Sequence, residues 1–218
     1  MRVFHFVKRA YGLEDIRRRR VKIATFDDLN DPFELFSVDL SDESLRRQFR
    51  WLASTLNLSQ GMICFSRKWN NPVQWSHYAE GHRGVCLAFD VPESNLLTVS
   101  YTRRRLVAEA QQIVASGRLD SHLIQRFLAT KYSHWRYENE SRWFVSLPVA
   151  DSDSGLYFRP FSEQLSLTQV IVGALSCISR DELREALGDL AQSVQTLKAR
   201  LAFGSFRVVR QRKQKLWR

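Results

Sequence analysis

Short apolar runs, each bounded by residues that favour turns, constrain the fold of this chain more than any other sequence feature. The clearest runs are VFHFV at 3–7, GMICFS at 61–66, GVCLAFDV at 84–91 and LTQVIVGAL at 167–175. Runs of this length are typical of buried strands, and the segments between them have helical spacing. Because strands and helices do not alternate regularly, we predict an α+β fold: a single mixed, mainly antiparallel sheet with flanking helices.

Helical spacing is strongest after Ser41, which can cap a helix that runs to about Leu56 and buries Leu45 and Phe49 on one face. Pro72 breaks the chain and begins a short helix. Further helices are predicted at about 105–116, 120–134 and 180–200. The sequence has no internal repeat or linker, so we expect one domain, 1–218, with a core at about 3–175 and a C-terminal helix plus a basic edge strand at 176–218.

Positive charge is concentrated in clusters. The 218 residues include 33 Lys and Arg against 23 Asp and Glu, which gives a formal net charge of +10. Clusters lie at 17–22, at 103–105 and in the tail after Phe206, which has no acidic residue. Such clusters attract polyanions by releasing condensed counterions, although a solvated basic surface explains the charge at least as well. The candidate nucleic-acid-binding residues are Arg207, Arg210, Arg212, Lys213 and Lys215.

The sequence carries no signal for a membrane, a secretory pathway or a metal. No apolar run approaches the length of a membrane span, and the basic N-terminal segment lacks the apolar core of a signal peptide. Cys64, Cys86 and Cys177 each lie in an apolar run, so we expect reduced core cysteines in a cytoplasmic protein. His77 and His82 have no third ligand at suitable spacing, and motifs for nucleotide-binding loops or serine hydrolases are absent, so no metal cofactor is expected.

The segment 63–90 has the densest group of aromatic and imidazole side chains. On a helix that begins near Pro72, Trp75 and Tyr78 share a face, and His82 joins them if the helix continues. Such a face can hold a planar ring by stacking, or it can fill the core, and residue type alone favours the core.

A second candidate group is the acidic pair Glu138 and Glu140 at the start of an apolar strand. If the segment is extended, both carboxylates project to one face together with Arg142. One carboxylate can hydrogen-bond a ribose hydroxyl or stabilise developing positive charge while the other orients a nucleophile. Alternatively, the pair forms salt bridges with Arg136, Arg142 or Lys131.

A third candidate group is NDPFE at 30–34. Asn30 or Asp31 can make an Asx-turn, and Pro32 fixes the backbone, which indicates a rigid corner. The same corner could present the amide of Asn30 and the carboxylate of Asp31 to a ligand.

Four phrases of the chain resemble a large family of uncharacterised bacterial proteins, a domain of unknown function. They are LNDPFELF, then CFS followed by PVQWSHYAEGHRGVCLAFD, then KYSHWRYENESRW, and finally VIVGAL. The resemblance covers roughly residues 3–175, and the W-S-H-Y-A-x-x-H-x-G stretch is its most specific part. It implies no activity.

The order of elements also resembles, more distantly, the ADP-ribosyltransferase fold of the diphtheria-toxin and poly(ADP-ribose) polymerase type. Those enzymes have a first strand with a His, a short helix followed by a strand, a strand before a helix that ends in Tyr, and a last strand led by a catalytic Glu. VFHFV, LEDIRRRRVKIAT, GMICFSRKW, PVQWSHYAEG and the triplet ENE at 138–140 follow that order. Here Phe rather than Gly follows His5, and Phe65 stands where the family has Tyr.

This resemblance implies an enzyme that uses NAD as its substrate and no metal. It places His5 against the nicotinamide-ribose or carboxamide side of NAD, Ser66 at the family's motif Tyr or Ser position, and Trp75 or Tyr78 against the nicotinamide ring. Glu140 would bond the ribose 2′-hydroxyl and stabilise the oxocarbenium ion, and Glu138 would assist the acceptor. The implied catalytic residues are Glu140, Glu138 and His5, and the candidate cofactor-binding residues are His5, Ser66, Trp75, Tyr78, His82, Asn30 and Asp31. It further implies that His5, Tyr78 and Glu140 converge on one cleft.

Two hypotheses of different classes follow. The first is an NAD-dependent ADP-ribosyltransferase or NAD glycohydrolase, a toxin or anti-phage defence effector with nucleic acid or a translation component as acceptor and an antitoxin or immunity partner. The second is a non-catalytic nucleic-acid or nucleotide-binding module that uses the basic surface. A nuclease ranks last, because the acidic residues do not cluster as metal ligands do.

Overall fold

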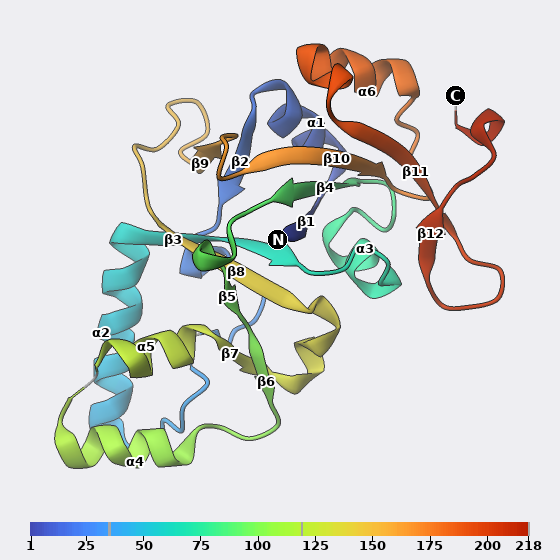
Figure 1. Ribbon diagram of the computed structural model, residues 1–218. Helices are drawn as coiled ribbons and strands as arrows, with labels where there is room; N and C mark the ends of the chain where they lie inside the picture. The colour runs from blue at the N-terminus through green and yellow to red at the C-terminus, as the bar shows by residue number, and fades with distance from the viewer. Residues whose placement is uncertain (35, 119, 218) are drawn as a thin grey trace. The chain divides into compact units, whose positions relative to one another are not determined.

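The computed structural model describes residues 1–218 except 35, 119 and 218. The described residues form two compact units. Unit 1 comprises Met1–Lys22, Phe65–Asn95 and Phe158–Arg218, and unit 2 comprises Ile23–Cys64 and Leu96–Tyr157. The fold is α+β, and the described residues include one large mixed sheet of eight strands together with flanking helices (Figure 1).

Five strands of this sheet lie in unit 1. They are β1 (Arg2–Val7), β4 (Val85–Asp90), β10 (Ser166–Val172), β11 (Gln195–Leu201) and β12 (Val208–Arg210). Their order is β12-β11-β10-β4-β1, with β10 and β11 parallel and the other neighbours antiparallel. β4 is apolar and buried from Val85 to Phe89, because β1 and β10 pair with it on both sides.

Helices pack on this part of the sheet. They are α1 (Arg9–Arg17), α3 (Pro72–Tyr78) and α6 (Arg180–Leu187), with short 3₁₀ turns η2 (Glu93–Asn95), η4 (Gly188–Gln192) and η5 (Gln214–Leu216). α1 contacts β4 and α6, and α3 contacts β1. Asn71 caps α3 by accepting a hydrogen bond from the Val73 N–H, and Pro72 occupies the first turn, as the sequence predicts.

A tight turn connects α3 to β4. Gly81 and His82 both have positive φ, at 56° and 69°. A Cβ atom on Gly84 would lie 2.2 Å from the carbonyl oxygen of Val7, so only glycine fits there. The W-S-H-Y-A-x-x-H-x-G stretch therefore has a structural reason: it ends a helix and returns the chain into a buried strand.

Unit 2 contains a smaller group of strands and helices. The strands are β3 (Gln60–Ser66, whose last two residues lie in unit 1), β8 (Glu140–Ser146) and β5 (Leu97–Thr98), in the order β3-β8-β5, with the parallel pair β6 (Ser100–Thr102) and β7 (Thr130–Tyr132). The helices are α2 (Glu43–Ser59), α4 (Val107–Ser116) and α5 (Ser121–Leu128), with η1 (Phe26–Asp28) and η3 (Ser133–Glu138). Their apolar faces meet in a core built around Phe49, Ile113 and Phe127. A further pair is formed by β2 (Arg20–Ile23) and β9 (Tyr157–Pro160), most of whose residues belong to unit 1.

Some local predictions are wrong. The cap of α2 is Asp42 rather than Ser41. The helix predicted at 180–200 ends at Leu187, since Gly188 has a φ of 53°, and 195–201 pairs with β10 as a strand. The helix predicted at 120–134 ends at Leu128, because Thr130 begins a strand that pairs with β6.

Candidate functional site

A network of five buried charged side chains lies inside unit 2. Lys131 Nζ is 2.7 Å from Glu138 Oε2, 3.3 Å from Glu140 Oε2 and 3.7 Å from Glu34 Oε2. Arg142 binds Glu140 through Nε–Oε1 at 2.9 Å and Nη2–Oε2 at 3.1 Å, and its Nη1 is 2.6 Å from Glu34 Oε1. The side chains of all five residues are at least nine-tenths buried.

The backbone around Asn139 explains how two neighbouring carboxylates reach one ammonium group. We expected 138–140 to be extended, but Glu138 ends the turn η3, and Asn139 is left-handed with a φ of 47°. Glu140 then begins β8. Asparagine tolerates this conformation better than most residues, because its short polar side chain can hydrogen-bond locally.

The NDPFE corner supplies the third carboxylate of the network. Asp31 Oδ1 accepts a hydrogen bond from the Phe33 N–H at 2.9 Å, which confirms an Asx-turn. Asp31 is buried, whereas Asn30 is exposed. The turn delivers Glu34, which sequence reasoning did not connect with Lys131 and Arg142. Glu34 Oε2 accepts no hydrogen bond from the described residues, although Lys131 lies near it.

The charges of the network favour the ionised forms of Glu140 and Lys131. Burial alone would raise the pKa of Glu140, but the charges of Arg142 and Lys131 outweigh it and lower that pKa to about 2. Burial would lower the pKa of Lys131, yet Glu140, Glu138 and Glu34 raise it above its ordinary value. The salt bridges that the sequence offered as the alternative role of Glu138 and Glu140 are therefore present.

Two of the candidate aromatic and imidazole residues of unit 1, Trp75 and His82, stack on each other but differ in burial. Trp75 is 0% exposed, its ring meets Phe6 edge-on, and its indole N–H donates to the Trp69 carbonyl at 2.6 Å. His82 lies beyond the end of α3 and stacks on Trp75 with centroids 6.2 Å apart. Burial lowers the pKa of His82. Trp75 thus occupies the core position that its residue type favours.

The remaining candidates in unit 1 lie on β1, at the end of β3 and at the end of α3. His5 lies on β1 opposite Leu87, with its ring edge-on to Phe65. Ser66 is buried and donates to the Lys68 carbonyl at 2.8 Å. Tyr78 is half-buried at the end of α3. The convergence of His5, Tyr78 and Glu140 on one cleft stays a prediction.

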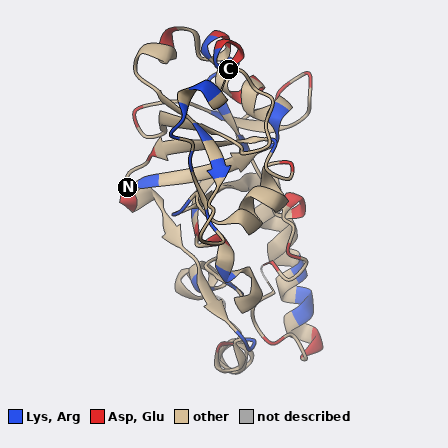
Figure 2. Ribbon diagram, turned by 90° about the vertical axis from the view of Figure 1, so that its right-hand side faces the viewer, with Lys and Arg blue, Asp and Glu red and all other residues tan. Residues whose placement is uncertain are grey.

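A basic groove lies at the C-terminal end of unit 1. Its volume is about 600 Å³. It is lined by Arg180, Thr196, Leu197, Lys198, Arg210, Gln211, Arg212, Lys213, Gln214 and Trp217. Five of these described lining residues are cationic and none is acidic. Figure 2 shows Lys and Arg residues in blue close to the C-terminus.

The groove is held in shape by its own contacts. Arg180 Nε donates to the Trp217 carbonyl at 2.8 Å, and its guanidinium carbon lies 4.8 Å from the centre of the Trp217 ring. Lys198 Nζ donates to the Ser176 carbonyl at 2.5 Å, and burial lowers the pKa of this lysine. The predicted residues Arg210, Arg212 and Lys213 line the groove. Arg180 and Lys198 were missed as groove residues, because 180–200 was predicted to be one helix, and Trp217 was not among the predicted residues.

The hairpin between β11 and β12 presents two phenylalanines at its tip. Phe203 and Phe206 are each 98% exposed. The hairpin is closed by a hydrogen bond from the Ala202 N–H to the Arg207 carbonyl at 2.9 Å. Arg200 lies over the Phe203 ring at 4.9 Å. An exposed apolar tip flanked by arginines is an unusual feature of a protein surface.

Within the described part of the chain, no three His, Cys, Asp or Glu side chains are grouped so as to hold a metal ion. No helix among the described residues is long and apolar enough to cross a membrane. Of the cysteines, Cys86 is buried as expected, whereas Cys177 is exposed, which contradicts its predicted core position.

Comparison with known proteins gives one partial match. Residues 74–143 match a family model described as "Protein of unknown function (DUF2971)". The match runs from Gln74 in α3 to Trp143 in β8, and it covers less than half of the chain. It includes every member of the ion network except Glu34. No curated protein and no solved structure matches the chain significantly. The match supports the resemblance to an uncharacterised family.

Proposed function

We propose that this protein is a nucleic-acid-binding module whose binding surface is the basic groove of unit 1. The observation that carries the proposal is the composition of the groove, which has five cationic side chains and no acidic one among its described lining residues. Phosphate groups that enter such a groove release counterions and meet several positive charges at once.

The charge around the groove extends beyond its lining. The sequence from 195 to 218 contains eight Lys or Arg residues and no Asp or Glu. A small anion would need only two or three of these charges, whereas a polyanion uses the whole stretch. Since Arg180 binds the backbone at Gln214 and Trp217, the cations are held on a fixed surface before a ligand arrives.

The hairpin tip favours a single strand over a duplex. Exposed aromatic rings bind unpaired bases by stacking, and arginines next to them neutralise the backbone. Phe203 and Phe206 offer such rings, and Arg207 and Arg210 follow them in sequence. An anionic membrane also attracts cations and aromatic residues, but a planar lipid surface does not enter a concave groove.

The NAD-dependent hypothesis receives less support from the local geometry. A carboxylate that stabilises an oxocarbenium ion must reach the ribose. Glu140 is buried and bound on both oxygens, and Glu138 is buried and bound to Lys131. Freeing either carboxylate would leave Lys131 or Arg142 buried with less compensation. We therefore propose binding rather than glycosidic cleavage.

The test measures binding of a short fluorescent single-stranded oligonucleotide at several salt concentrations. The variant Arg210→Gln/Arg212→Gln/Lys213→Gln should bind at least about tenfold more weakly, and its salt slope should fall by about 2, because three phosphate contacts are lost. The matched control is Lys8→Gln/Arg17→Gln/Arg83→Gln, which removes three exposed cations of unit 1 outside the groove. Equal affinity and equal slope in the two variants would refute the proposal.

A second assay addresses the enzymatic alternative directly. Purified protein is incubated with NAD, and released nicotinamide is measured for the parent chain and for Glu140→Gln. If the chain only binds nucleic acid, neither protein releases nicotinamide. Release by the parent that is lost in Glu140→Gln would replace binding with NAD cleavage as the function of this chain.

A further inference from the structure

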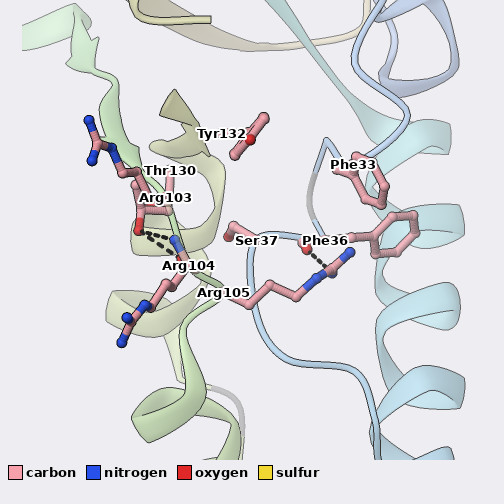
Figure 3. Close-up of a pocket in the computed structure, with 9 residues that line it drawn as sticks. Phe33, Phe36, Ser37, Arg103, Arg104, Arg105, Thr130 and Tyr132 are labelled. Carbon is pink, nitrogen blue, oxygen red and sulfur yellow. Dashed lines mark hydrogen bonds between the residues drawn. The ribbon is translucent and has the colours of Figure 1, made fainter. Parts of the chain in front are cut away.

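Unit 2 contains a pocket that shares no residue with the basic groove of unit 1 or with the buried ion network (Figure 3). Its volume is about 230 Å³. It is lined by Phe33, Phe36, Ser37, Thr102, Arg103, Arg104, Arg105, Thr130 and Tyr132. In Figure 3, Phe33 and Phe36 lie on one side of Ser37, and Thr130 and Tyr132 lie on the other. The pocket therefore has aromatic walls that come from two distant segments of the sequence.

The aromatic walls are accessible. Phe33 is 53% exposed and Tyr132 is 44% exposed, which is costly for such large rings in water. The Tyr132 ring stacks on His134 with centroids 4.5 Å apart and an angle of 25° between their planes. A second flat ring can continue this stack on the free side of Tyr132.

The pocket is preorganised by its own hydrogen bonds. Arg105 Nη1 donates to the Phe36 carbonyl at 2.6 Å and to the Val38 carbonyl at 3.3 Å, which holds the Phe33–Phe36 wall to the arginine segment. Thr102 Oγ1 accepts from the Arg104 N–H and donates to the Arg104 carbonyl, which fixes the turn before α4. A ligand would thus meet walls that are already in place.

Two of the arginines beside the pocket have positive charges that no described residue neutralises. A second hollow of about 530 Å³, lined by Arg103, Tyr132, Ser133, His134 and Arg136, shares Arg103 and Tyr132 with the pocket. The guanidinium groups of Arg103 and Arg104 make no hydrogen bond or ion pair with any described residue. No acidic residue is among the described lining of either hollow. Ser37 Oγ is buried and has no hydrogen-bond partner among the described residues.

We infer that this pocket binds a nucleotide, with the base between Tyr132 and the Phe33–Phe36 wall and the phosphate on Arg103 and Arg104. Each part of the pocket matches one part of that ligand: the rings match a planar base, the arginines match a phosphate, and Ser37 offers a hydrogen bond to a base edge. A purely apolar ligand would leave the arginines unused. The inference concerns unit 2 alone and does not depend on the proposed groove in unit 1.

The ligand is either a free nucleotide or the end of a strand, and the experiment separates these sources. Isothermal titration of the full chain uses AMP, adenosine, ribose 5-phosphate, NAD and a dinucleotide with or without a 5′-phosphate. We expect AMP to bind at least about tenfold more tightly than adenosine or ribose 5-phosphate, since each lacks one half of the contacts. Tight binding of the phosphorylated dinucleotide with weak binding of AMP also supports the site and identifies a strand end as its ligand.

Variants of the pocket locate the binding. Tyr132→Ala and Arg103→Gln/Arg104→Gln should each weaken the preferred ligand by about tenfold or more. The control variant, Arg118→Gln, removes an exposed arginine of unit 2 that lines neither hollow and should bind like the parent. Far-UV circular dichroism confirms that each variant is folded.

Two outcomes overturn the inference. One is that no phosphorylated compound binds the folded parent chain. The other is that binding is unchanged in both pocket variants, or is lost only in the Arg210→Gln/Arg212→Gln/Lys213→Gln variant of the groove. The last result would also show that the groove of unit 1 is the nucleotide site, so failure here and failure of the proposed function are distinguishable.

Discussion

The cores of the two units are stabilised by different kinds of contact. Unit 1 buries an apolar strand, β4, together with the indole of Trp75. Unit 2 has an apolar cluster around Phe49 and also buries the network centred on Lys131 and Arg142. Apolar packing is non-directional, whereas each buried ion costs several kcal/mol in lost hydration unless its partners are in place.

The difference predicts where each unit is most sensitive to substitution. In unit 1 the stability lost on substitution should depend on the side-chain volume removed and on the local hydrogen bonds broken. In unit 2 the loss of stability should follow the change in charge, because three buried carboxylates share two cations. The variants below test that difference from the largest expected effect to the smallest.

Arg142→Ala should have the largest effect. It leaves Glu34 and Glu140 buried with only Lys131 to compensate them, and we expect a loss of about 3–5 kcal/mol in the free energy of unfolding. Urea denaturation followed by circular dichroism measures the loss. Arg142→Lys keeps the charge but not the two parallel contacts with Glu140, so it should lose less. A loss of under about 1 kcal/mol for the alanine variant would mean that the charges are hydrated rather than buried.

The sequence predicted the apolar core far better than the charged one. The strands at 3–7, 61–66, 84–91 and 167–175 could be predicted, because a short run of apolar residues by itself indicates a buried strand. Helix ends were less predictable. α6 ends where Gly188 adopts a positive φ, and α5 ends before Thr130, which begins a strand that pairs with β6. The strand at 195–201 was missed because its stability comes from pairing with β10 rather than from its own residues.

The candidate sites were also predicted only where their residues lie close together in the sequence. The pair Glu138 and Glu140 was visible in the sequence, and so were Lys131 and Arg142 as partners. Glu34, at the other end of the unit's sequence, was not linked to them, because long-range ion pairs leave no periodic signal. The groove was half predicted: the run after Phe206 showed its charge, but Lys198 and Arg180 required the β10–β11 pairing to be known.

Asp15→Asn tests a buried carboxyl group in unit 1, whose core is mainly apolar. Burial raises the pKa of Asp15 from 3.8 to about 7, with Arg20 lowering it only in part and Glu14 raising it further. The raised pKa gives stability that is fully present below about 3.8 and is lost as the pH rises through 7. The Asn variant should therefore match the parent at low pH and exceed it above neutrality by up to about 4 kcal/mol.

Thermal or urea unfolding at a series of pH values measures this difference. The control is Asp181→Asn, an exposed position on α6 whose stability difference from the parent should not follow the same pH course. If the Asp15→Asn variant gained the same amount at every pH, the gain would come from something other than ionisation.

Trp75→Phe should have an intermediate effect. The variant keeps an aromatic ring but leaves a void, and the Trp69 carbonyl loses its 2.6 Å hydrogen bond. We expect a loss of about 1–3 kcal/mol that is independent of pH and salt, in contrast with the network of unit 2. A strong salt dependence of this loss would contradict the view that unit 1 is stabilised mainly by apolar packing.

Arg47→Gln should have the smallest effect, and it separates burial from charge as the cause of sensitivity in unit 2. Arg47 Nη1 lies 3.1 Å from Glu43 Oε1 on α2, a distance similar to those in the network, but the two side chains are 68% and 72% exposed. Water and salt screen such a pair, and holding two long side chains in one geometry offsets most of its attraction. The urea midpoint of unfolding should not shift measurably for this variant. A loss of stability comparable to that of Arg142→Ala would show that unit 2 is destabilised by the loss of any ion pair. Burial of the network would then not explain its sensitivity to substitution.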